Sequence, residues 1–350
     1  MSGRTRAPVV RRGFCIFNLP PGRGARVRTL AVALLLMAGL LAACTVTSCG
    51  RSSPWDFQTV EGDSSLLSVS AADPSHVWVV GGGPVYFFDG VSWNTQVQSL
   101  ETEPLDVSAA DPTHIWACGG DGKGVVFASD GKTWNKQFET GDKSMGVIAA
   151  ADPSQVWAAA TNQADTGTNI YFFNGASWSL QYSADIHVQD MSAVDARHAW
   201  AVAEDRQGKS AVYFFDGSAW SRSFVPAEGE ALFGIAAADP SDAWAVGSAP
   251  ASGGGSAHVG GSIFHFDGST WKKQYETAEE LHKVTAPDAS HAWATGGIGT
   301  TGPIYYFGGS YWSRQFSGKE PLFDISAPDS GHAWAVGGLG SIFTYEPAGP

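Results

Sequence analysis

The chain has 350 residues, of which 43% are hydrophobic and 16% charged, and it contains 43 Gly and 14 Trp. This composition excludes an intrinsically disordered protein and is enough to fill a large core. The net charge is −13, and residues 1–43 hold seven Arg and no acid, so the rest of the chain carries −20. Such acidity disfavours nucleic acid or an anionic membrane surface as a partner of the folded part. No stretch offers the roughly 20 apolar residues that a membrane-spanning helix needs.

The first 43 residues are predicted to be an export signal. Three Arg between residues 23 and 28 precede an apolar run over residues 30–43, and residues 41–44 read Leu-Ala-Ala-Cys. A positive segment, a short apolar segment and small residues before a cleavage point are typical of a signal peptide rather than of a structural helix.

The Leu-Ala-Ala-Cys sequence resembles the lipobox of bacterial lipoproteins. The resemblance implies that the Cys44 thiol carries diacylglycerol and anchors the mature chain, with residues 44–54 as a tether and the lipid as the only contact with a membrane. Several acyl chains on one Cys satisfy the two signals that stable anchoring needs. We therefore expect an extracytoplasmic, lipid-anchored protein of the bacterial cell envelope, in the outer membrane if the cell has two membranes, since Thr45 is not a retention Asp. A plain secretory signal, lipidation at Cys49 and a twin-arginine signal at residues 11–12 are the alternatives.

After the tether, one motif recurs seven times, and such self-similarity predicts a repeat architecture. In each copy a Trp follows an Asp by five residues. The Asp and Trp pairs are Asp73 and Trp78, Asp111 and Trp116, Asp152 and Trp157, Asp195 and Trp200, Asp239 and Trp244, Asp288 and Trp293, and Asp329 and Trp334. A second Trp series alternates with the first: Trp93, Trp134, Trp178, Trp220, Trp271 and Trp312. Equivalent Trp residues are 38 to 51 positions apart.

The two ends of the array complete each other. Five of the six second-series Trp have a Gln three residues later, and Trp55 has Gln58 at the same offset. The last unit stops after residues 342–345 and lacks its own terminal Trp segment. We therefore expect residues 55–60 to be the outer strand of the last unit, which closes a ring of seven.

Each unit contains four strand-like runs separated by Asp-Pro, Gly-Gly and Asp-Gly turns. In the first unit these runs are residues 67–71, 76–80, 85–88 and 92–97. Four-stranded sheets that repeat with this period are the blades of a propeller, in which radial packing buries both faces of each sheet. The fold class is therefore all-β: a seven-bladed β-propeller over residues 55–350 with four antiparallel strands per blade.

Residues 127–134, Phe-Ala-Ser-Asp-Gly-Lys-Thr-Trp, resemble the Asp-box, or bacterial neuraminidase repeat, in which an Asp-Gly turn precedes Thr-Trp. Four other units have looser versions, and residues 308–309 depart from the pattern because they are Gly-Gly. The family includes sialidases and other sugar-active enzymes, a photosystem assembly factor, sorting receptors and lipoproteins. The box is a structural turn, so the resemblance implies the fold and not an activity.

Five His lie two residues before a first-series Trp: His76, His114, His198, His291 and His332. Each is in a different blade, so they cannot meet at the roughly 2.0–2.3 Å distances that one metal ion needs. We interpret these His as local hydrogen-bonding groups and the preceding Asp as a turn lock that accepts backbone N–H groups. The paired Trp are interpreted as packing surfaces between blades. No metal site and no cofactor are predicted, apart from possible Ca²⁺ at the acidic loops.

The loops differ between the two faces of the expected ring. Connections one-to-two and three-to-four are uniform, whereas connections two-to-three and four-to-one vary and are placed on the opposite face. The four-to-one loops hold thirteen acids and only two bases, Lys143 and Lys319. The candidate binding acids among them are Glu101, Glu103, Glu228, Glu230, Glu279 and Glu280. Variable loops on one face predict the binding surface there.

The first strand of each unit adds a second set of candidates. Ten residues before each first-series Trp stand Ser68, Asp106, Val147, Asp190, Gly234, Lys283 and Asp324. These positions alternate with an apolar series, so the alternation of side chains along a strand turns them toward the central channel. Asp106, Asp190, Asp324 and Lys283 are the predicted site at its mouth. The alternative is a solvated channel lining in which Lys283 pairs with Asp106 or Asp324.

We expect a binding module and no catalytic residues. A sialidase needs several Arg side chains that converge on a carboxylate. The mature chain has five Arg, and those at 222 and 314 are placed on outer strands away from the mouth. The same scarcity counts against the photosystem assembly role. The main hypothesis is a non-catalytic, lipid-anchored propeller whose acidic face binds a cationic protein or a bridging divalent cation. A propeller that binds or hydrolyses glycans and an assembly factor for a membrane complex are the alternatives.

Overall fold

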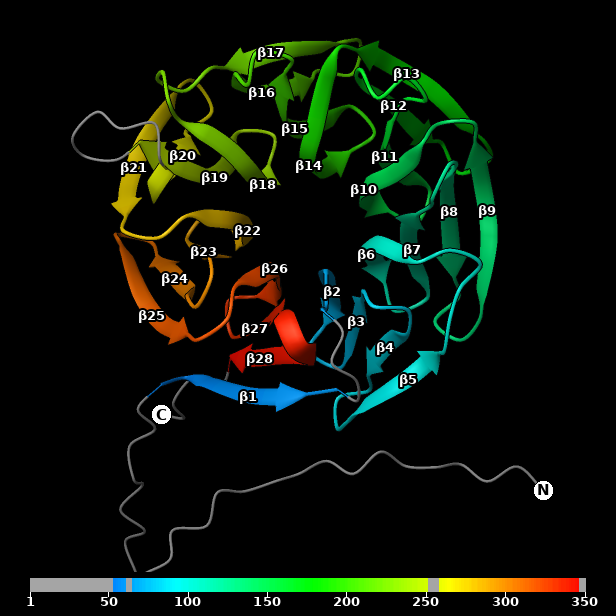
Figure 1. The fold of residues 1–350 in the computed structure, drawn as a ribbon, viewed down its shortest axis with the longest axis horizontal. Helices are drawn as coiled ribbons and strands as arrows, with labels where there is room; N and C mark the ends of the chain where they lie inside the picture. The colour runs from blue at the N-terminus through cyan, green and yellow to red at the C-terminus, as the bar shows by residue number, and fades with distance from the viewer. Residues whose placement is uncertain (1–52, 61–64, 251–257, 346–350) are drawn as a thin grey trace, which may run out of the picture. The chain divides into compact units, whose positions relative to one another are not determined.

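The structure, a computed structural model of the chain, describes residues 53–60, 65–250 and 258–345. The predicted signal, the lipidation candidate Cys44 and most of the tether lie outside these residues. In the described part, seven four-stranded antiparallel sheets surround a common centre (Figure 1). The predicted all-β, seven-bladed propeller is confirmed.

The strands of each blade are consecutive in the chain, with the innermost strand first. The bounds in blades 1 to 3 are β2 (Ser68–Asp73), β3 (His76–Val80), β4 (Val85–Phe88) and β5 (Trp93–Val97); β6 (Pro104–Asp111), β7 (His114–Gly119), β8 (Gly124–Ser129) and β9 (Trp134–Thr140); and β10 (Ser144–Asp152), β11 (Gln155–Thr161), β12 (Thr168–Phe173) and β13 (Trp178–Ala184). Blades 4 to 6 comprise β14 (Ile186–Asp195), β15 (His198–Asp205), β16 (Ser210–Phe215) and β17 (Trp220–Phe224); β18 (Ala231–Asp239), β19 (Asp242–Pro250), β20 (His258–Phe266) and β21 (Trp271–Thr277); and β22 (Leu281–Asp288), β23 (His291–Gly296), β24 (Gly302–Gly308) and β25 (Trp312–Gly318).

Blade 7 combines the two ends of the described chain. It contains β26 (Leu322–Asp329), β27 (His332–Gly337), β28 (Ser341–Tyr345) and, as its outer strand, β1 (Trp55–Thr59). A single 3-10 turn, η1 (Gly338–Gly340), joins β27 to β28. The antiparallel register runs from Trp55 opposite Tyr345 to Thr59 opposite Ser341. Figure 1 shows the blue β1 beside the red β28. The predicted closure of the ring is therefore confirmed.

The core consists of interfaces between blades. Every first-series Trp is at most 4% exposed, and four of these Trp meet a second-series Trp of the next blade edge-on. Trp157 and Trp220, for example, have ring centroids 5.4 Å apart. Such aromatic pairs add about 0.5–1.5 kcal/mol beyond the area they bury. The interpretation of the Trp residues as packing between blades is confirmed.

The repeated turns also behave as expected. In the one-to-two turn of blade 1, Asp73 accepts the backbone N–H of Ser75 at 2.7 Å and contacts His76 Nδ1 at 2.9 Å. The His and Asp pairs of the other four His-containing turns have the same contact. In the Asp-box turn, Asp130 accepts the N–H groups of residues 132 and 133, and Gly131 has φ of +84°, where glycine is favoured. These turns form the uniform face of the ring.

Candidate functional site

Three of the predicted channel residues are carboxylates that join neighbouring blades near the centre. Asp324 of blade 7 accepts the backbone N–H of Val69 in blade 1 at 2.8 Å. Asp106 of blade 2 accepts the N–H of Ile148 in blade 3 at 2.8 Å. Asp190 makes the same kind of bond from blade 4 to blade 5. Between the described strands no β-ladder crosses a blade boundary, so these bonds tie the innermost strands together.

Lys283 is the cation of this central cluster. Its Nζ lies 2.6 Å from Asp190 Oδ1, which belongs to the second blade along the ring. The blade between them has Gly234 at the equivalent position, where an added Cβ would lie 2.8 Å from the Cα of Lys283. The missing side chain therefore lets Lys283 pass over blade 5. The alternative of a solvated channel lining paired Lys283 with Asp106 or Asp324, and the structure pairs it with Asp190 instead, across the space that Gly234 leaves.

The remaining two carboxylates share one hydroxyl group. The Ser68 Oγ lies 2.7 Å from Asp106 Oδ1 and 2.8 Å from Asp324 Oδ2. One hydroxyl carries one proton and can donate to only one carboxylate at a time. Burial is the largest cause that raises the pKa of Asp324, to about 6. The charge of Lys283 lowers this pKa, and the charge of Asp106 raises it by a smaller amount. A proton on Asp324 would satisfy both contacts of Ser68.

The neighbouring carboxylates keep Lys283 protonated. Burial lowers the pKa of Lys283, but the attraction of Asp190, Asp324 and Asp106 outweighs it, so the pKa is raised. Burial also raises the pKa of Asp190, and the nearby ammonium limits that rise. The cluster is a network of buried and half-buried groups that bind one another. It holds the centre of the ring together, and its role as a ligand site stays a prediction.

The candidate acids of the variable loops are mostly bound as well. Glu101 pairs with Lys123 and Lys136 at 2.8–2.9 Å. Glu230 pairs with Lys273 at 2.6 Å, and Glu279 pairs with Arg314.

The other candidates differ in how they are held. The carboxylate of Glu103 accepts the N–H of Gly82 at 3.0 Å, and Glu280 contacts His282 at 3.0 Å. Glu228 is exposed. The count of acids against bases within the loops missed these partners, because the bases come from outer strands and from two-to-three loops. Lys136, Lys273 and Arg314 all lie two residues after a second-series Trp, which is the sequence signal that could have revealed them.

The outer rim of blades 5, 6 and 7 shows one arrangement in three versions. In each blade a Glu lies two residues before a Leu at the start of the first strand, which is Leu232, Leu281 or Leu322. This Glu approaches a pair of residues that face each other across the third and outer strands. The pair is Phe264 and Lys273 in blade 5, Tyr305 and Arg314 in blade 6, and Phe343 and Phe57 in blade 7. The corresponding acids are Glu230, Glu279 and Glu320. Blade 7 alone among the three has no base on its outer strand.

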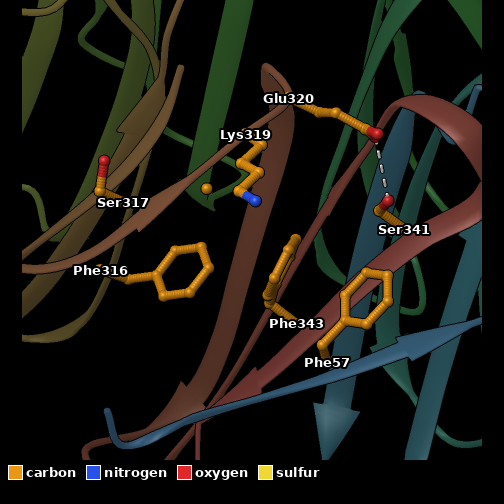
Figure 2. Close-up of a pocket in the computed structure, with 8 residues that line it drawn as sticks. Phe57, Phe316, Ser317, Lys319, Glu320, Ser341 and Phe343 are labelled. Carbon is orange, nitrogen blue, oxygen red and sulfur yellow. Dashed lines mark hydrogen bonds between the residues drawn. The ribbon is translucent and has the colours of Figure 1, made fainter. Parts of the chain in front are cut away.

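A pocket of about 340 Å³ lies at this rim position of blade 7. Figure 2 shows its walls: Phe57 and Phe343 from blade 7, Phe316 from blade 6, and the polar side chains of Lys319, Glu320 and Ser341. The Phe343 ring is 5.2 Å from that of Phe57 and 4.7 Å from that of Phe316, measured between centroids. We call this site the rim pocket. Its size is within the range of small-ligand sites.

Exposed apolar side chains lie on the variable face in the same two blades. Ile298 and Leu339 occupy the two-to-three loops of blades 6 and 7 and are 59% and 57% exposed. Both follow a Gly-Gly pair and precede a Gly. Leu339 has φ of +54°, a conformation that is uncommon for a residue with a branched side chain. Phe57 at the rim pocket is 60% exposed. We call the surface formed by Ile298, Leu339 and the rim pocket the blade 6–7 surface.

The described residues also provide information on metal sites, membrane-spanning helices and reactive thiols. Among the described residues no group of three or more His, Cys, Asp or Glu is placed to hold a metal ion. Within the same ranges no helix is long and apolar enough to cross a membrane. Cys118 is a buried free thiol, and burial raises its pKa.

Several solved structures share the fold at low sequence identity. YCF48 bound to D1 peptide is 16% identical with a TM-score of 0.62, over 85% of this chain and 98% of that chain. YCF48 from Cyanidioschyzon merolae is 16% identical with the same TM-score, over 84% and 99%. A chain of the mitotic checkpoint complex is 12% identical with a TM-score of 0.65, over 91% and 100%. No protein-family model and no curated protein sequence matches the chain. The likeness therefore shows the propeller fold.

Proposed function

We propose that this chain is a non-catalytic propeller that holds a segment of a partner protein against the blade 6–7 surface. The likeness to YCF48, solved with a bound D1 peptide, supports a polypeptide ligand. An assembly factor for a membrane complex, one of the alternatives from the sequence, is one form that this function could take. The proposal also includes membership of the Asp-box group, for which the turn at residues 127–134 is the evidence.

The observation that carries the proposal is the exposure of apolar side chains in blades 6 and 7, one of them at the rim pocket. Exposed apolar patches that are rimmed by polar residues mark interaction sites. Ile298, Leu339 and Phe57 are each more than half exposed and belong to neighbouring blades. Most candidate acids elsewhere on the variable face are bound by bases or N–H groups of the chain itself, so a purely acidic binding face is less well supported than a mixed apolar and charged one.

We further propose that the propeller is displayed outside the cytoplasm on a lipid anchor at Cys44. The support is the signal-like sequence of residues 1–43 and the small residues before Cys44. Cys44→Ala should move the protein from the membrane fraction to the soluble fraction in the producing bacterium. Retention of this variant in the membrane fraction would contradict the anchor.

The protein-binding proposal is tested with full-length protein extracted in mild detergent. The double variant Ile298→Asp and Leu339→Asp places charges on the blade 6–7 surface. The matched control, Val91→Asp with Tyr311→Asp, changes side chains that are 77% and 74% exposed on turns of the uniform face. We expect the first variant to lose a co-purifying protein that the wild type and the control retain. Equal recovery with all three proteins would overturn the assignment of the surface.

A further inference from the structure

The rim pocket of blade 7 repeats a site that is already occupied in blade 5. In blade 5 the carboxylate of Glu230 accepts the hydroxyl of Ser262 at 2.7 Å and lies 2.6 Å from the ammonium of Lys273. That ammonium also lies 5.7 Å from the centroid of the Phe264 ring. A carboxylate on one side and an aromatic face on the other are the two groups that attract an organic cation.

Four of the five groups of this arrangement recur in blade 7. Glu320, Ser341 and Phe343 take the places of Glu230, Ser262 and Phe264, and Ser341 donates a hydrogen bond to Glu320 at 3.3 Å. Phe316 of the preceding blade packs on Phe343 at 4.7 Å, as Phe224 packs on Phe264 at 5.2 Å. The fifth group, the ammonium, is missing because Phe57 stands where blade 5 has Lys273.

In blade 6 the cation is a guanidinium instead of an ammonium, and comparing the two blades indicates which kind of cation would fit blade 7. There Tyr305 and the guanidinium of Arg314 both bind Glu279, and no Ser occupies the position of Ser341. Blade 7 has Phe and Ser at these positions, as the ammonium-binding blade 5 does. The surroundings in blade 7 therefore match an ammonium more closely than a guanidinium.

Lys319 does not supply the missing charge from within the chain. In the ranges that the structure describes, the Lys319 ammonium lies within 4.0 Å of no carboxylate. The cation–π contact in these ranges is formed by Lys273 with the Phe264 ring. Lys319 has no counterpart in blade 5, where the residue before the Glu is Gly229. Figure 2 shows its side chain at the wall of the pocket, beside the space between the Phe316 and Phe343 rings. We therefore expect the Lys319 charge to weaken, and not to replace, the binding of a second cation.

We propose that the rim pocket binds the ammonium group of a lysine side chain from the partner polypeptide, between Glu320 and the rings of Phe57, Phe316 and Phe343. The source of the lysine rests on the proposed protein-binding function, whereas the affinity for an alkylammonium does not. The aliphatic stem of the lysine packs against the aromatic walls while its ammonium takes the position that Lys273 holds in blade 5.

The test is a titration of the full-length protein in mild detergent, followed by the NMR shifts of the ligand. The probes are n-butylammonium chloride and, as its neutral counterpart, 1-butanol. We expect millimolar binding of butylammonium, at least about tenfold weaker binding of butanol, and weaker binding of butylammonium at high salt. Equal binding of the two probes, or no binding of butylammonium, would overturn the ammonium site.

Three variants locate the site. Phe57→Lys rebuilds the blade 5 arrangement within the chain and should abolish butylammonium binding while the fold persists. Glu320→Gln should weaken binding at least about tenfold, and Lys319→Gln should strengthen it. Asp121→Asn, at an exposed acid of blade 2, is the control and should leave binding unchanged. Undiminished binding to Phe57→Lys would contradict the proposed position.

A second arm separates the ammonium site from its proposed source. The peptides acetyl-Gly-Lys-Gly-amide and acetyl-Gly-norleucyl-Gly-amide differ in the ammonium group alone. Tighter binding of the lysine peptide than of butylammonium, with loss in Phe57→Lys, supports a polypeptide ligand. If butylammonium binds and the lysine peptide does not, the lysine of a partner protein is excluded, while the protein-binding surface at Ile298 and Leu339 is still judged by its own experiment.

Discussion

The centre of the ring and the outer rim of blade 7 treat charge in opposite ways. At the centre, Lys283 crosses blade 5 to reach Asp190, and Asp324 and Asp106 bind backbone N–H groups of the following blades. At the rim of blade 7, Glu320 has a hydroxyl partner and faces a pocket. At the centre the carboxylates are bound by Lys283, by the Ser68 hydroxyl and by backbone N–H groups of the next blade, whereas Glu320, at the blade that the N-terminal strand closes, has no base. Groups bound to each other act in stability, whereas the incomplete rim is available to a partner.

The largest expected effect comes from breaking the central pair. Lys283→Met leaves the buried carboxylate of Asp190 without its cation, and such a change typically costs about 3–5 kcal/mol. Lys272→Met is the control, because Lys272 is 64% exposed beside Asp267 and exposed pairs contribute about 0–1 kcal/mol. The free energy of unfolding in urea measures both. A loss for Lys283→Met no larger than that of the control would show that the central cluster does not stabilise the ring.

The closing strand offers a second contrast, between two aromatic residues two positions apart. Trp55 is 5% exposed and packs on Tyr345 and the core of blade 7, whereas Phe57 is 60% exposed. We expect Trp55→Ala to cost about 3 kcal/mol, as for large buried side chains, and Phe57→Ala to cost less than about 1 kcal/mol. Thermal unfolding followed by circular dichroism tests this. Similar losses in the two variants would mean that β1 is not locked into the ring by its buried residue.

The central cluster also predicts a dependence on pH. The pKa of Asp324 is raised to about 6 by burial, whereas an unfolded Asp titrates near about 3.9. Between these values the folded protein keeps a proton that the unfolded chain has lost, so this group's contribution to stability falls as pH rises from about 4 to about 6. The difference in the free energy of unfolding, wild type minus Asp324→Asn, should be about 2–3 kcal/mol larger at pH 4 than at pH 7.

Asp216 is the matched control for this measurement. Hydrogen bonds from Ser218 and from backbone N–H groups lower the pKa of Asp216 to about 2 in an exposed turn. Its contribution is present above the unfolded pKa and is lost as pH falls, which is the opposite sign. Urea titrations at several pH values provide the data. A difference between wild type and Asp324→Asn that grows with pH would contradict a proton held by Asp324.

The smallest expected effect on stability is at the rim itself. Phe57→Lys should give Glu320 an ion pair like that between Lys273 and the buried Glu230 in blade 5. Because Glu320 is more exposed than Glu230, the pair should add only the roughly 0.2–1 kcal/mol of a surface pair. A small rise in the unfolding midpoint is therefore expected at low salt, and it should disappear at high salt because the charges are screened. A fall in stability at low salt would indicate that Phe57 packs in the pocket more tightly than its exposure suggests.

The sequence was sufficient for the fold because the repeat carries the information locally. Each blade repeats its Trp, its turn Asp and its strand alternation, and Trp55 with Gln58 identifies the displaced outer strand. The channel carboxylates were also found from their repeat position. Their partners were not, because Lys283 pairs across 93 residues through a gap that depends on Gly234.

The rim pocket was missed for a similar reason. Its rings come from β25, β28 and β1, so residues 57 and 343 are cross-strand neighbours from opposite ends of the chain. Counting charges loop by loop cannot show that Lys273 and Arg314 neutralise loop acids while Phe57 leaves one without a base. Comparing the residue two positions after each outer-strand Trp would have narrowed the choice to blades 1, 3 and 7, which have Thr95, Leu180 and Phe57 where the other four blades have Lys or Arg.

The most direct test of the account asks where a lysine side chain lies in the complex. Transferred and intermolecular NOEs can be recorded between the Cε protons of acetyl-Gly-Lys-Gly-amide and the aromatic protons of the protein. The account predicts NOEs to the rings of Phe316 and Phe343 that vanish in Phe57→Lys. NOEs that remain in this variant, or that arise only from rings outside blades 6 and 7, would contradict the proposed rim site.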